Sequence, residues 1–144
     1  MLTGRTKLQA LANARLSDAK ALLGRKRWSG AYYLGGYAIE LALKSRVLIY
    51  LHESDFVFGA SIPKIQFREF WTHDLYDLAV LGGLKEELER EVTSSVVFEE
   101  NWALVKDWSE SSRYLETTEN QADRLFKAIG HPDYGVLPWI QKHW

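Results

Sequence analysis

The segment 28–53 contains almost no charge over its first half. Up to Leu43, Glu40 is the only side chain that is charged at neutral pH. Apolar or small residues would cover every face of a helix formed here, so we expect neighbouring elements to enclose it. Gly35 and Gly36 each lower helix stability by about 1 kcal/mol, and we predict that another helix packs closely where their Cβ atoms are missing. The pattern therefore predicts the central helix of a small bundle.

Apolar spacing predicts helices on both sides of this segment. Leucine and alanine recur at helical spacing from about Thr3 to Leu23, and Gly24 is expected to end that helix in a left-handed conformation. The short link that follows makes the first two helices antiparallel neighbours. Thr72 is the expected N-cap of a third helix that ends at Gly82. Further helical segments are predicted at 84–93, 98–108, 120–129 and from about residue 138 onward.

The stretch from Glu53 to Phe70 is apolar but has no sustained period, and Gly59 and Pro63 interrupt it. We expect an ordered loop that packs on the bundle, and loops of this length are often functional. The predicted fold class is all-α, an up-and-down bundle of four to five helices with a long ordered loop after helix two. A chain of 144 residues is expected to form one domain, residues 1–144.

Composition adds expectations about assembly and compartment. Aromatic residues make up 13% of the chain, and such residues often anchor interfaces, which favours a homodimer. Cysteine is absent, which excludes disulfides and thiolate metal sites and is typical of a reducing compartment. The chain has neither an apolar run of signal-peptide length near its start nor a stretch of membrane-spanning length. We therefore expect a cytoplasmic protein without a membrane span.

Charge is distributed unevenly, although the net charge is only −1. Residues 1–27 contain seven basic side chains and one acid, whereas residues 85–123 contain eleven acids and four bases. Such asymmetry indicates a phosphate-binding face or charge-complementary assembly. Solvated helix faces give the same pattern, so charge alone does not separate these interpretations.

Two arginine–histidine pairs are the strongest candidates for chemistry. The chain has no phosphate-binding glycine loop, nucleophile elbow or metal-ligand cluster, so we expect no metal and no cofactor. Arg68 and His73 have an R-x4-H spacing, and Arg124 and His131 have an R-x6-H spacing. Neutral histidine can accept a ribose 2′-hydroxyl proton while a guanidinium stabilises charge on phosphorus. The structural alternatives are a His73 that bonds a loop carbonyl, a solvated Arg124, and a His131 that contacts carbonyls at a helix end.

Glu40 is a separate candidate, because a buried carboxylate costs several kcal/mol unless it is paired. Lys44 lies one helical turn later and is the expected partner. Arg113 is a second candidate partner from the far end of the chain. A structural ion pair that joins the central helix to a neighbour is the favoured interpretation, and a residue lining a cleft is the alternative.

Residues in four segments resemble the HEPN domain family. Ala14, Arg15 and Leu22-Leu23 resemble its first helix, and Tyr32 to Lys44 closely matches its second-helix signature of aromatic and small residues, then glutamate and lysine. Thr72 to Leu78 resembles the family's T-H-D-L element, and Ser112-Arg113-Tyr114 resembles its S/T-R-Y element. The resemblance covers most of the chain and implies a bundle of four or five helices that commonly forms a homodimer.

The resemblance implies one of two functional branches. A ribonuclease branch, which includes toxins paired with a minimal nucleotidyltransferase antitoxin, has an arginine and a histidine separated by four to six residues. Both pairs satisfy that spacing, but Glu69 and Leu125 stand where the family often has asparagine or aspartate after the arginine. The other branch lacks the motif, is thought to bind nucleotides or assist assembly, and carries both the T-H-D-L and S-R-Y elements.

Three hypotheses follow. The favoured one is a nucleotide- or RNA-interacting module in a toxin–antitoxin, stress or defence setting, with a nucleotidyltransferase as candidate partner. Its expected phosphate-binding groups include Arg68, His73 and Arg113, together with Lys44 and Tyr114, with Glu40 organising them. The second is a metal-independent endoribonuclease that uses His73 as base and Arg68 as charge stabiliser. The third is a purely structural dimerisation domain that has no site.

Overall fold

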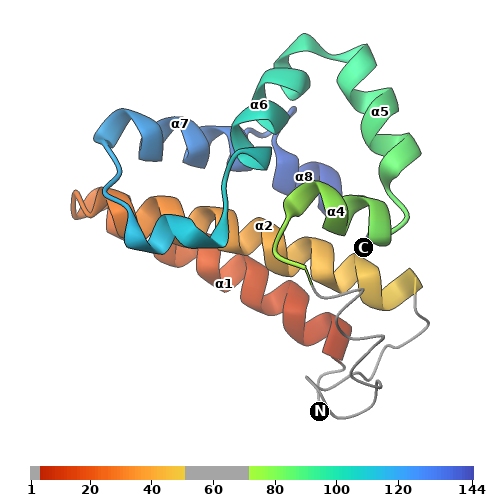
Figure 1. Ribbon diagram of the computed structural model, residues 1–144, viewed down its shortest axis with the longest axis horizontal. Coiled ribbons are helices and arrows are strands. Elements are labelled where there is room, and N and C mark those ends of the chain that lie inside the picture. Colours follow the sequence, from red (N-terminus) through yellow and green to blue (C-terminus); the bar gives the residue numbers. More distant parts are fainter. Residues whose placement is uncertain (1–3, 51–71) are drawn as a thin grey trace.

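The computed structural model describes residues 4–50 and 72–144, whose regular secondary structure is entirely helical (Figure 1). They form seven α-helices and one short 3₁₀ helix, and none of them belongs to a strand. The expected fold class is therefore confirmed at the level of an all-helical protein, whereas the expected count of four to five helices was too low. Gly83, with φ of 74°, and Ser95 divide the segment 75–106 into three short helices. The predicted ordered loop from Glu53 to Phe70 lies outside the described residues.

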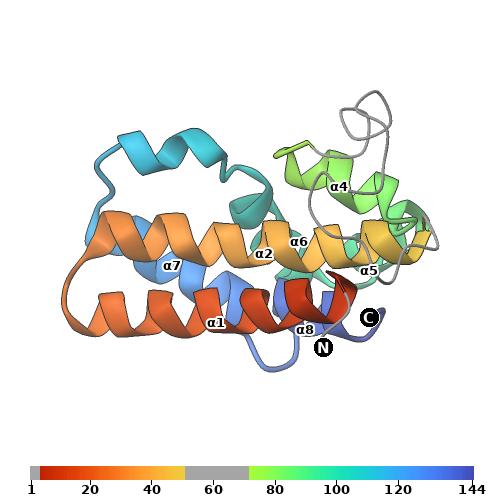
Figure 2. The same ribbon diagram turned by 90° about the horizontal axis from the view of Figure 1, so that it is seen from below.

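Two long antiparallel helices form the base of the molecule. Helix α1 (Gly4–Gly24) and helix α2 (Trp28–Tyr50) lie side by side along their length (Figures 1 and 2). Helix α2 also packs against four later elements, and its residues 38–45 are all buried, so it is the predicted central helix. The left-handed residue between the two helices is Lys26, with φ of 59°, and not Gly24 as expected. Gly24 still belongs to α1, and the chain reverses only after it.

The later helices are shorter and cover α2. They are α4 (Leu75–Leu81), α5 (Lys85–Ser94), α6 (Val96–Lys106), the 3₁₀ helix η1 (Glu110–Tyr114), α7 (Glu119–Gly130) and α8 (Val136–Gln141). Helix α7 packs against both α2 and α6, whereas α5 and α6 rise away from the long pair (Figure 1). None of the helices in the described part of the chain is long and apolar enough to cross a membrane.

The predicted close approach of another helix is confirmed at Gly35, whereas a side chain just after α6 packs on Gly36. A Cβ added to Gly36 would overlap the ring of Trp108, and one added to Gly35 would lie 3.3 Å from Ile129 of α7. Trp108 follows the last residue of α6 by two positions and also stacks on Tyr33, with ring centroids 6.0 Å apart. The contact between Trp108 and Gly36 therefore holds the end of α6 against α2.

Helix α4 begins later than predicted. Its N-cap is Asp74, whose side chain accepts a hydrogen bond from the backbone N–H of Asp77 at 2.8 Å. Thr72, the expected N-cap, instead accepts a hydrogen bond from the backbone N–H of Asp74 at 3.1 Å. His73 therefore lies before the helix, in a turn shaped by its two neighbours. From this position the imidazole contacts Glu40 and Glu110.

Candidate functional site

Glu40 is the buried centre of the first candidate site. Its side chain is 1% exposed on α2, and the Lys44 Nζ atom lies 3.2 Å from Glu40 Oε2. The predicted i, i+4 ion pair is therefore present and almost completely shielded from solvent. Burial, followed by the negative charge of Glu40, raises the pKa of the neighbouring Tyr37 hydroxyl. Such a carboxylate has to be neutralised by nearby groups to be tolerated in a core.

His73 extends this pair to two further elements. Its Nδ1 atom lies 2.9 Å from Glu40 Oε1, and its Nε2 atom lies 3.0 Å from Glu110 Oε2 at the start of η1. A neutral imidazole carries one N–H and can donate to only one of these carboxylates, whereas a protonated ring can donate to both. Each ring nitrogen thus faces a carboxylate, although half of the side chain is exposed.

Arg113 does not reach Glu40, contrary to the alternative pairing considered above. Its Nη2 atom lies 3.7 Å from Glu110 Oε1, and its guanidinium lies over the ring of Tyr114, 4.8 Å from the centroid. The contact with Tyr114 also raises the pKa of Arg113. Glu110 is the nearer acid because it lies on the same short helix, three residues earlier.

We call these five residues, Lys44, Glu40, His73, Glu110 and Arg113, the Glu40 network. It joins α2, the turn before α4, and η1 through side chains that alternate in charge when His73 is protonated. Arg68, the expected partner of His73, lies outside the described residues. A general base needs a ring nitrogen that is free to take a substrate proton. Both nitrogens of His73 already face carboxylates, so the network is arranged to hold elements together.

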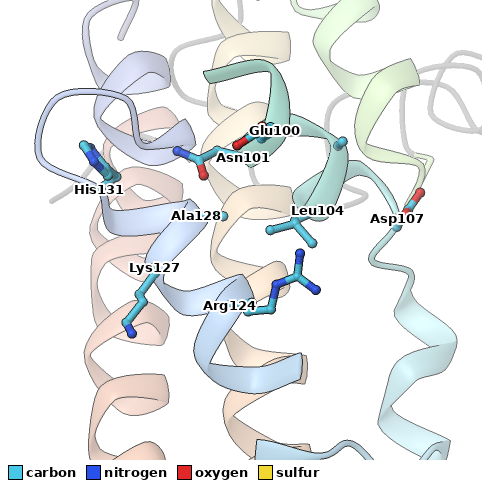
Figure 3. Close-up of a pocket in the computed structure, with 9 residues that line it drawn as sticks. Glu100, Asn101, Leu104, Asp107, Arg124, Lys127, Ala128 and His131 are labelled. Carbon is cyan, nitrogen blue, oxygen red and sulfur yellow. The ribbon is translucent and has the colours of Figure 1, made fainter. Parts of the chain in front are cut away.

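A second candidate site lies between α6 and α7. It is a cleft of about 640 Å³, which we call the α6–α7 cleft (Figure 3). Its lining residues are Glu100, Asn101, Ala103, Leu104, Asp107, Arg124, Lys127, Ala128 and His131. Both members of the R-x6-H pair are therefore among them. This volume lies in the range of small-molecule sites, which are about 300–1,000 Å³.

Arg124 enters the cleft without a charged partner. It is exposed on α7, its side chain extends toward Leu104 of α6, and among residues 4–50 and 72–144 it makes no hydrogen bond or ion pair (Figure 3). Lys127, one turn further along, instead pairs with Asp123 at 2.9 Å. A guanidinium offers five N–H donors in a planar fork that matches phosphate and carboxylate. The unpaired Arg124 is therefore suited to bind an anion.

His131 has a role that the sequence did not indicate. Its Nδ1 atom accepts hydrogen bonds from the backbone N–H groups of Asp133 at 3.1 Å and Tyr134 at 3.0 Å. It thus contacts amides of the following turn, and not the carbonyls at the end of α7 that we expected. Because Nδ1 is an acceptor, the neutral ring carries its proton on Nε2. That tautomer donates a hydrogen bond and is unsuited to remove a proton.

Asp107 and Tyr32 extend the cleft toward α2. They line an adjoining hollow of about 290 Å³ together with Gln121 and Arg124, and Leu104 lines both spaces. Burial, followed by the nearby charge of Asp107, raises the pKa of the Tyr32 hydroxyl. Sequence reasoning missed Asp107. The feature of the sequence that could have identified Asp107 is an acidic residue at the predicted C-terminus of a helix, where the helix dipole favours a basic side chain.

A scan of protein-family models, a search of curated proteins and a search of solved structures found no match to this chain. In the described part of the chain, no group of three or more histidine, cysteine, aspartate or glutamate side chains is placed to hold a metal ion. The chemistry of the site therefore has to be argued from its own residues.

Proposed function

We propose that this protein is a HEPN-like, non-catalytic module that binds a nucleotide or RNA through phosphate at the α6–α7 cleft. The observation that carries the proposal is the Arg124 guanidinium, which enters a cleft of about 640 Å³ without a partner among the described residues. A charge left unpaired in a concave surface offers its hydrogen bonds to a ligand. A phosphate group fits the planar fork of arginine and is common to nucleotides and RNA.

The other lining groups suit the same ligand. His131 offers an Nε2–H donor, and Lys127 also lines the cleft, with its charge paired to Asp123. Leu104 and Ala128 provide apolar surface between the polar groups, which suits the face of a nucleobase. The cleft therefore combines an anion-binding end with apolar surface, as expected for a mononucleotide or one segment of a single strand.

The three motifs of the family resemblance meet in the Glu40 network. Glu40 and Lys44 come from the second-helix signature, His73 from the T-H-D-L element, and Arg113 from the S-R-Y element. This convergence supports a HEPN-like fold for the chain. The same contacts give these residues a structural role, because they join α2 to later elements. A structural role for His73 favours the binding branch over an endoribonuclease that depends on His73.

Assembly belongs to the same proposal. Tyr114 and Leu115 are 75% and 62% exposed next to the network, and exposed aromatic and aliphatic side chains of this kind favour self-association. A homodimer and a nucleotidyltransferase partner fit the family resemblance, and both are expected to use surfaces outside the cleft.

Calorimetric titration with 5′-AMP and a short single-stranded oligoadenylate tests the proposal. We expect both to bind in buffer with EDTA, and we expect Arg124→Gln to weaken binding about tenfold or more, because a charge-assisted phosphate contact is lost. Arg90→Gln is the matched control, since Arg90 pairs with Glu87 at 2.8 Å on α5 and does not line the cleft. Absence of binding, or equal binding by the Arg124 variant, would reject the proposal.

The same oligonucleotide is then recovered and analysed for cleavage. Intact RNA is the expected result. Cleavage by the wild type that is lost in His73→Ala would instead establish the endoribonuclease.

A further inference from the structure

Asp107 carries an unpaired negative charge at an unfavourable position. It is the C-cap of α6, where the partial negative charge of the helix dipole lies. Among the described residues its side chain makes no hydrogen bond and no ion pair, although it is near Tyr32. An acid at this end of a helix lowers helix stability. Where a local rule is broken without compensation in the fold, a functional reason is expected.

Asp107 also lines three neighbouring spaces in this part of the molecule. It borders the α6–α7 cleft, the hollow beside Tyr32, and a smaller hollow of about 130 Å³ under η1. Ser112 lines this last hollow, and its buried hydroxyl has no hydrogen-bond partner among the described atoms. Arg124 lines the first two spaces but makes no ion pair with Asp107 within this part of the chain. Neighbouring spaces that share lining residues thus present an unpaired cation and an unpaired anion.

We infer that Asp107 accepts a hydrogen bond from the ribose 2′-hydroxyl of the ligand, so that the site selects ribonucleotides over deoxyribonucleotides. The inference rests on the proposed nucleotide site. An ionised carboxylate only accepts hydrogen bonds, and a sugar hydroxyl donates one. The same carboxylate repels phosphate, which places phosphate at Arg124 and sugar at Asp107.

Neighbouring groups favour a sugar at this end of the site. The raised pKa keeps the Tyr32 hydroxyl protonated, so it remains a donor. The unpartnered Ser112 hydroxyl can both donate and accept. Glu100 is the other acid of the α6–α7 cleft, but it lines neither of the two smaller hollows. Asp107 is therefore the acid best placed to contact the sugar of a ligand that is held at Arg124.

The test compares 5′-AMP with 2′-deoxy-AMP, with inorganic phosphate as a third probe, in calorimetric titrations of the full chain. For the wild type we expect 5′-AMP to bind about tenfold more tightly than the deoxynucleotide, the effect of one hydrogen bond to a charged group. In Asp107→Ala the ratio should fall to about one, as expected when this hydrogen bond is lost, while binding of 2′-deoxy-AMP is retained or strengthened. Glu99→Gln is the matched acidic control and should keep the wild-type ratio, because Glu99 is exposed on α6 and lines none of these spaces.

The possible failures are distinguishable. Equal affinity of the wild type for the two nucleotides, or an unchanged ratio in Asp107→Ala, overturns the role of Asp107 but leaves the nucleotide site standing. Absence of binding of either nucleotide to the wild type overturns the proposed function and this inference together. Phosphate that binds as tightly as 5′-AMP also overturns the inference, because the sugar would then contribute nothing. Circular dichroism of each variant shows that it is folded.

Discussion

The Glu40 network and the α6–α7 cleft differ in whether their charged side chains have partners of opposite charge. In the network, each carboxylate and each cation lies within 3.7 Å of a group of opposite or potentially opposite charge. In the cleft, Arg124 and Asp107 have no such partner among the described residues. Burial explains why Glu40 and Lys44 are paired, because their side chains are 1% and 5% exposed, whereas Arg124 is exposed. A buried charge has to be paired within the fold, whereas an exposed one can be left to a ligand.

The two regions are nevertheless built from one connected segment. Asp107 is the C-cap of α6 and Glu110 begins η1, so only two residues lie between a lining group of the cleft and a member of the network. Trp108 lies between them and packs on Gly36 of α2. The network therefore helps to set where the wall of the cleft lies.

The largest effect is expected for Lys44→Met. This change leaves the Glu40 carboxylate buried without the ammonium that lies 3.2 Å away. We expect a loss of about 3–5 kcal/mol in the free energy of unfolding, measured by urea denaturation. The double variant Glu40→Leu/Lys44→Met removes both charges and should recover most of that loss. A loss below about 1 kcal/mol in the single variant would mean that the pair contributes no more than an exposed one.

Gly36→Ala should have the next largest effect. The added methyl group overlaps the Trp108 ring, so the ring has to move, at a cost of about 1–3 kcal/mol. Thermal unfolding measures this loss. Gly24→Ala is the control, because no atom lies within 4 Å of its added Cβ and alanine favours a helix. Nucleotide affinity should fall in Gly36→Ala and stay unchanged in Gly24→Ala. Unchanged affinity in Gly36→Ala would show that Trp108 does not position Asp107.

The sequence predicted what local spacing determines. Near-absence of charge identified α2 as the central helix, and the i, i+4 spacing identified the Glu40–Lys44 pair. The contact between His73 and Glu40 spans 33 residues, and no spacing rule states which side chain of a later turn reaches across a bundle. The helix count was too low because it followed the four or five helices that the family resemblance implies. The segments predicted separately at 84–93 and 98–108 do correspond to two helices, α5 and α6, which meet at Ser95.

In the α6–α7 cleft, even less could be predicted from local spacing. The R-x6-H spacing found two residues that do line one space, Arg124 and His131. It gave no information on the tautomer of His131, which the amides of Asp133 and Tyr134 determine. Nor did it find Asp107, whose position depends on the contact of the next residue, Trp108, with α2. Residue types and spacing thus indicated two residues that line one cleft, whereas the chemistry available there depends on contacts made after the chain has folded.

A smaller effect on stability is expected for Arg124→Gln. Arg124 is exposed and has no ion pair to lose among the described residues, so its replacement should change the free energy of unfolding by less than about 0.5 kcal/mol. Urea denaturation beside Lys44→Met gives the direct comparison. A loss above about 1 kcal/mol would show that Arg124 supports the fold, and its loss of nucleotide binding could then no longer be assigned to a missing contact.

The smallest effect tests the electrostatic environment of the cleft without any ligand. Burial and then the charge of Asp107 raise the pKa of Tyr32 above its ordinary value of 10.0. A phenol with a raised pKa in the folded state contributes stability that is fully present below pH 10 and is lost as the pH rises through the folded-state pKa. Asp107→Asn keeps the volume but removes the charge, so the pKa of Tyr32 should fall part of the way back, while burial still holds it above 10.0. Tyrosinate absorbance measures this shift when the curve of a Tyr32→Phe protein is subtracted. An unchanged titration curve in Asp107→Asn would mean that Asp107 is too far from Tyr32 for both groups to contact one sugar. The cleft would then be an anion site formed by Arg124 alone.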